Sequence, residues 1–208
     1  MKQLDKLTNK AKSNKKTLLF LVILFIVGII AGSLFITILN TSDKTLVKEY
    51  LEKFIMNLQQ NKLDYTASFI NSLISNLFYV IVIWLLGISV IGLPIILFLY
   101  FAKAFILGFS ISSILFHYQL KGIVIAFCYI FPHHIINVLI FTLLVLYSMR
   151  LSIRISKTLI TKKSLDFRLI MKKYGIILGI CLVGSIITSV LEVFVMPTLL
   201  KLCMSIIS

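Results

Sequence analysis

The chain is 208 residues long, 60% of its residues are hydrophobic, and its mean hydropathy is +1.07. A soluble domain of this size could not bury so much apolar surface, so the composition excludes water-soluble enzymes from first consideration and indicates an all-α, polytopic membrane protein. The net charge of +14 does not point to nucleic acid, because the basic residues adjoin apolar spans, where membrane orientation and anionic lipid head groups explain them.

The first apolar span is predicted at 17–39, behind a basic segment at 1–16. This order resembles a signal sequence, but the span is longer than a usual signal core. We therefore expect an uncleaved membrane anchor.

Apolar residues then recur at helical spacing over 40–64, with charged residues between them. This pattern predicts one amphipathic helix outside the membrane. The helix could rest on the bilayer or cover the bundle, or it could present a docking face to an extracytoplasmic partner.

The run from Tyr65 to Leu120 contains a single formal charge, and a tight reversal at Gly92-Leu93-Pro94 lies near its middle. One crossing needs about 20 apolar residues as helix, so the run predicts two spans, at 66–91 and 94–117. Pro94 can begin the second of them, since a proline in the first turn loses no hydrogen bond.

Two further spans are predicted at 122–148 and 174–200, which makes five transmembrane helices in one integral membrane domain over 1–208. Pro132 lies inside the fourth span and should break or kink it, because proline removes a backbone donor where water is scarce. Pro197 lies near the end of the fifth span.

Polar residues follow the break in the fourth span: His133, His134 and Asn137. They could supply the hydrogen bonds that the broken helix lacks, or they could form a proton relay or ligand site. By helical rise, Glu192 of the fifth span lies at nearly the depth of the two histidines. We therefore predict that Glu192 faces the bundle interior and pairs with one of them.

Lys103 is the fifth member of this intramembrane polar cluster. It lies nine residues after Pro94, about 14 Å along its helix. Its depth differs from that of Glu192, so we expect a hydrogen bond from Lys103 to carbonyls at a broken helix rather than an ion pair with Glu192.

Basic residues crowd two segments, 1–16 and 149–173, which fall on the same side of the membrane if there are five spans. Basic loops favour the cytoplasmic side. We therefore predict a cytoplasmic N-terminus and an extracytoplasmic Ser208, with both basic segments on membrane lipid head groups.

No set of residues in the chain suggests catalysis, a metal site or a cofactor. Adjacent histidines point about 100° apart on a helix and do not match the His-Glu-x-x-His motif of zinc proteases. Cys128, Cys181 and Cys203 lie in or beside apolar spans without Cys-x-x-Cys spacing, so we expect small core residues rather than a zinc site or disulfide framework.

Three segments resemble the stage II sporulation protein M family. Residues 84–96 read Trp-Leu-Leu-Gly-Ile-Ser-Val-Ile-Gly-Leu-Pro-Ile-Ile; residues 131–133 read Phe-Pro-His; and residues 191–197 place a glutamate five residues before a proline. Relatives often have glycine in place of His134 and glutamate in place of Asn137.

The resemblance implies a scaffold that anchors peptidoglycan hydrolases, the stage II sporulation proteins P and D, at the septal and engulfing membranes during endospore formation. It does not identify the contact residues. The helix predicted over 40–64 is our first candidate for docking, particularly Tyr50, Phe54 and Leu58. The alternative is a transporter or permease-like subunit with a polar site at the broken fourth span.

Overall fold

The structure is a computed structural model that describes residues 2–60, 62–161 and 167–207, with side chains described over 15–60, 62–161 and 167–203. Ser208 and parts of the two basic segments predicted from the sequence lie outside these ranges. All the elements within them are helical. In chain order they are α1 (Lys2–Ile38), α2 (Thr41–Gln59), α3 (Tyr65–Gly87), α4 (Gly92–Ile125), η1 (Ala126–Ile130), α5 (Phe131–Thr161), α6 (Phe167–Val190), η2 (Leu191–Val195) and α7 (Met196–Ile207).

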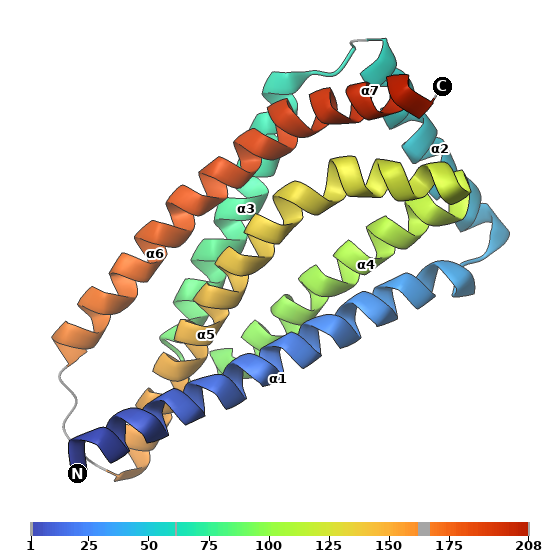
Figure 1. The fold of residues 1–208 in the computed structure, drawn as a ribbon. Helices are drawn as coiled ribbons and strands as arrows, with labels where there is room; N and C mark the ends of the chain where they lie inside the picture. Colours follow the sequence, from blue (N-terminus) through green and yellow to red (C-terminus); the bar gives the residue numbers. More distant parts are fainter. Residues whose placement is uncertain (1, 61, 162–166, 208) are drawn as a thin grey trace.

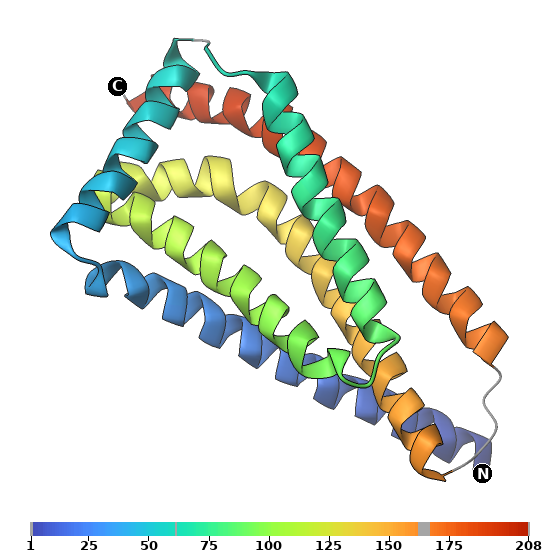
Figure 2. The ribbon, with the colours of Figure 1, turned by 180° about the vertical axis from the view of Figure 1, so that it is seen from behind.

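The long helices form an elongated bundle, and four stretches of the described residues are long and apolar enough to cross a membrane (Figure 1). These are Lys15–Ile38, Tyr65–Gly87, Gly92–Thr161 and Phe167–Cys203. The third stretch is not straight, because the backbone leaves helical geometry at Gln119, with φ 50° and ψ −126°. The chain turns back there, so α4 and α5 run beside each other in both views (Figures 1 and 2).

Different helices reach the two ends of the bundle. The start of α1, the end of α5 and the start of α6 lie at one end, and α2 and α7 lie at the other (Figure 2). At the first of these ends Lys15 of α1 and Arg150 of α5 line one groove, and Arg154 follows Arg150 by one turn of α5.

The two prolines inside helical spans each follow a π-helical turn. η1 ends two residues before Pro132, and η2 ends two residues before Pro197. Proline lacks a backbone donor and its ring crowds the carbonyl four residues earlier, and a π-helical turn shifts the hydrogen-bonding register at such a point. The backbone remains helical through η1, so the expected break at Pro132 is a widened turn rather than an interruption. Pro94, in contrast, lies in the first turn of α4.

Helices α1 and α4 approach each other closely through glycines. A Cβ atom added at Gly32 would collide with the Phe105 carbonyl, and one added at Gly108 would collide with the Ile29 carbonyl. Ser33 adds a hydrogen bond of 3.2 Å to the carbonyl of Gly108. Small residues allow such close approach between membrane helices, where dispersion contacts replace the hydrophobic effect.

Helix α2 closes the end of the bundle opposite the start of α6 (Figure 2). Ile55 and Leu58 are buried, and Leu58 is 0% exposed in an apolar cluster with residues such as Leu107 and Leu200. The apolar face of this helix thus packs on the bundle, which is one of the placements that the sequence left open.

The cysteines only partly follow the expectation of small core residues. Cys181 is buried and free, as predicted. Cys128 of η1 and Cys203 of α7, however, form a disulfide, so the prediction was wrong for this pair. The pairing could not be predicted from the sequence, because the two cysteines are 75 residues apart and follow no spacing motif. They meet only because η1 packs on α7.

Candidate functional site

A polar network crosses the interior between α3, α5 and the α6–η2 region. Ser72 Oγ donates a 2.6 Å hydrogen bond to Glu192 Oε2, and the Asn76 amide donates to Ser72 Oγ at 3.4 Å and to Ser189 Oγ at 3.1 Å. Asn137 donates to Asn76 Oδ1 at 3.3 Å. Side chains from three helices are thus joined where apolar neighbours offer no alternative partners, which favours one register between these helices.

The two histidines form a pair of their own on α5. Nε2 of His133 lies 2.6 Å from Nδ1 of His134, so one ring donates a hydrogen bond to the other. His133 is 2% exposed, and the ring of Tyr129 lies 6.1 Å from its ring at a steep angle.

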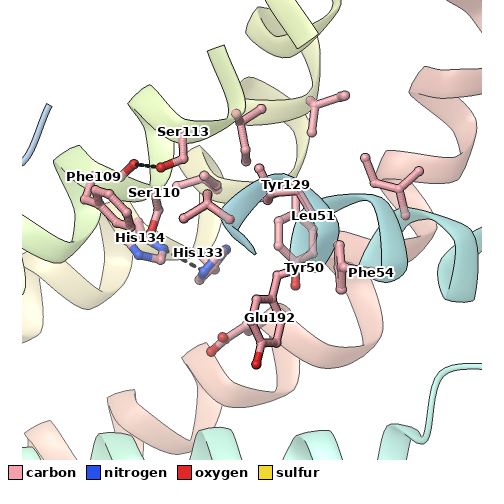
Figure 3. Close-up of a pocket in the computed structure, with 15 residues that line it drawn as sticks. Tyr50, Leu51, Phe54, Phe109, Ser110, Ser113, Tyr129, His133, His134 and Glu192 are labelled. Carbon is pink, nitrogen blue, oxygen red and sulfur yellow. Dashed lines mark hydrogen bonds between the residues drawn. The ribbon is translucent and has the colours of Figure 1, made fainter. Parts of the chain in front are cut away.

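The histidine pair lines a cavity of about 480 Å³ beneath α2 (Figure 3). Figure 3 shows Tyr50, Leu51 and Phe54 of α2 on one side of this cavity and Glu192 of η2 on another. Most of its walls are apolar; besides the histidines and Glu192, the polar groups of Tyr50, Ser110, Ser113 and Tyr129 line it.

Glu192 is half-buried and lies between this cavity and a second one of about 410 Å³, which Ser72 and Asn71 also line. The predicted pairing of Glu192 with a histidine is wrong. Among the described residues no hydrogen bond or ion pair joins Glu192 to His133 or His134, and its carboxylate accepts from Ser72 instead. Glu192 lines one cavity with both histidines, but its carboxylate bonds to Ser72 of α3.

Lys103 lies apart from Glu192, between two aromatic rings. Its Nζ is 4.5 Å from the centroid of Tyr79 and 5.1 Å from that of Phe141. The ammonium thus meets the negative faces of two rings. The expected hydrogen bond to backbone carbonyls is not found among the described residues. Lys103 does share a smaller cavity, of about 210 Å³, with His134 and Asn137.

The three residues proposed for docking have different surroundings. Tyr50 is 77% exposed, whereas Phe54 is half-buried with its ring 5.1 Å from that of Tyr129. Leu58 is fully buried and cannot touch a partner, so it is withdrawn as a docking residue. Leu46, one turn before Tyr50 and 53% exposed, takes its place, and the exposed pair Leu46 and Tyr50 forms what we call the outward side of α2, although Tyr50 also lines the histidine cavity.

Ser72, Asn76 and Ser189 were not among the predicted site residues, because none of them carries a charge or lies beside a proline. A signal was present: Ser72 and Asn76 are four residues apart and therefore share one helical face within an apolar span. Uncharged polar residues in such spans often bond across helices.

A scan against protein-family models matches residues 21–197 to the family described as Stage II sporulation protein M. The chain belongs to this family. The matched range contains α2, the histidine pair and Glu192. Membership implies a sporulation-related membrane protein, and the stage II sporulation protein M family is not a known enzyme family. No curated protein and no solved structure matches the chain.

Proposed function

We propose that the protein is a non-catalytic membrane scaffold that recruits peptidoglycan hydrolases, the stage II sporulation proteins P and D, to the septal and engulfing membranes. The observation that carries the proposal is the family match over 21–197. The interior of the bundle is consistent with a structural role, because a network of polar side chains bonds across the helices.

The proposed topology has five crossings, with the N-terminus in the cytoplasm. In this topology the reversal at Gln119 divides the long stretch Gly92–Thr161 into two crossings, so that the four candidate stretches give five crossings. The proximity of Lys15 and Arg150, with Arg154 one turn further along α5, supports a cytoplasmic location for that end. Helix α2 and the C-terminus then face the cell wall.

The outward side of α2 is the proposed docking face, defined by Leu46 and Tyr50. Both side chains are exposed, whereas Leu51, Phe54, Ile55 and Leu58 of α2 pack on the bundle. Tyrosine is enriched among residues that dominate binding energy at interfaces, since it buries a large rigid ring and retains a polar tip.

The test is co-purification of the two hydrolases with the full chain from sporulating cells. The double variant Leu46→Asp/Tyr50→Asp should lose both hydrolases while it accumulates normally. Met56→Asp is the matched control, because Met56 is 50% exposed on another side of α2. Normal recovery of both hydrolases with the double variant would refute this docking face.

A transporter or permease-like subunit is the second candidate, and one observation favours it. Glu192 lies between cavities of about 480 and 410 Å³, so a carboxylate separates two spaces in the protein interior. Glu192→Gln distinguishes the two functions. The scaffold requires that this variant, when it accumulates normally, still recruits the hydrolases and supports engulfment. Loss of engulfment with intact recruitment would favour transport.

A further inference from the structure

A groove between α1 and α5, which shares no lining residue with the histidine cavity, combines two cations with an apolar wall. Its volume is about 480 Å³. The α5 side is a single helical stripe, because its residues recur at intervals of three and four. The members of this stripe are Leu139, Thr142, Leu143, Leu146, Tyr147 and Arg150.

The two cations lie at one end of the groove. Lys15 and Leu18 contribute the α1 side, and Arg150 ends the stripe on α5. The guanidinium of Arg150 lies 5.5 Å from the centroid of Tyr147, which holds the charge over the groove. No carboxylate is present among the described residues that line the groove.

The other end of the groove is apolar and open to the surroundings. Leu139 is 66% exposed and Leu143 is 37% exposed. Behind them the Tyr100 hydroxyl of α4 and the Thr142 hydroxyl share a 2.8 Å hydrogen bond, so the polar group of the floor already has a partner. The end of the groove at Leu139 and Leu143 therefore offers apolar contact to a bound molecule.

The length of the groove matches half of a bilayer. From Leu139 to Arg150 the helical rise is about 16 Å, and one leaflet of a hydrocarbon core is about 15 Å thick. A molecule with an anionic head at Lys15 and Arg150 would extend a chain to Leu139 within one leaflet.

We propose that this groove is a binding site for an anionic phospholipid. The phosphate lies between Lys15 and Arg150, and one acyl chain lies along the stripe on α5. Basic pockets between membrane helices select anionic head groups through the same charge complementarity. The bound lipid would fill the space between α1 and α5 at the basic end of the bundle.

The test uses the full chain in lipid vesicles with Leu139→Trp as a fluorescent reporter at the apolar end of the groove. Phosphatidylglycerol or phosphatidylcholine, each with brominated acyl chains, is added as a minor component to an unbrominated phosphatidylcholine host. The native Trp84 is the same in every sample. Brominated phosphatidylglycerol should quench the reporter at several-fold lower mole fraction than brominated phosphatidylcholine.

In the reporter chain, Lys15→Gln/Arg150→Gln should reduce this preference by about an order of magnitude, since each basic side chain near the surface contributes separately. Lys16→Gln/Arg154→Gln removes the same charge from exposed residues that do not line the groove, and it should keep the preference. An equal effect of both pairs would overturn the site in favour of general surface attraction.

Two outcomes decide the proposal even if the first double variant does not fold. Equal quenching of the unaltered reporter chain by both brominated lipids would show unselective lipid contact and overturn the proposal. Displacement of the brominated lipid by inorganic phosphate would show that the acyl chain contributes nothing, which also contradicts it.

Discussion

Ser72 of α3 donates a hydrogen bond of 2.6 Å to the carboxylate of Glu192 in η2, across 120 residues of sequence. This bond attaches η2, the turn that follows α6, to α3. It also explains how a carboxylate is accommodated between cavities without a close cationic partner among the described residues.

Ser72→Ala should destabilise the protein by about 1–3 kcal/mol, because the half-buried carboxylate loses its hydrogen-bond donor. Thermal unfolding in detergent measures the loss. Ser75→Ala is the control, since Ser75 is exposed on the same helix and makes no hydrogen bond among the described residues. Equal stability of the two variants would remove the structural role assigned to the Ser72–Glu192 bond.

Asn76→Leu should cost more, about 2–4 kcal/mol, since both Ser189 and Asn137 lose a buried partner. The double variant Asn76→Leu/Asn137→Leu should lose less than the sum of the single variants, because the two side chains bond to each other. A double-mutant cycle by thermal unfolding measures this coupling. Strict additivity would contradict a shared network.

Gly32→Leu should destabilise the packing of α1 on α4 by about 1–3 kcal/mol or more, because its side chain collides with the Phe105 backbone. Gly179→Leu is the matched control, since nothing lies within 4 Å of a Cβ at that position. The two variants are compared by their level in the membrane and by thermal unfolding. A well-tolerated Gly32→Leu would mean that α1 does not pack this closely.

The Cys128–Cys203 disulfide predicts a single free thiol. Denaturation without reductant, followed by maleimide labelling and mass spectrometry, should add one label, on Cys181. Reduction first should allow three labels. Three labels without reduction would show that η1 and α7 are not covalently joined in the purified protein.

The sequence was sufficient for features that depend on hydropathy along the chain. The apolar runs, the first-turn position of Pro94 and the apolar face of α2 required only length and periodicity. The helical period of α2 does not say whether its apolar face meets solvent or the bundle. Leu58 was therefore predicted as a docking residue, although Ile55 and Leu58 are buried.

The partners of the polar residues were harder to predict, because they depend on how helices rotate about their axes. Helical rise predicted a depth for Glu192, but depth does not determine whether the side chain turns toward His133 or Ser72. The widened turn of η2 adds a further rotation before Pro197. Lys103 likewise found aromatic rings from two other helices rather than carbonyls.

The central claim, recruitment of hydrolases by the outward side of α2, is tested most directly by the position of a fluorescently tagged stage II sporulation protein P in sporulating cells. With the unaltered chain or Met56→Asp the tag should gather at the septum. With Leu46→Asp/Tyr50→Asp at the same protein level it should spread over the membrane. Septal gathering of the tag in the double variant would contradict the account.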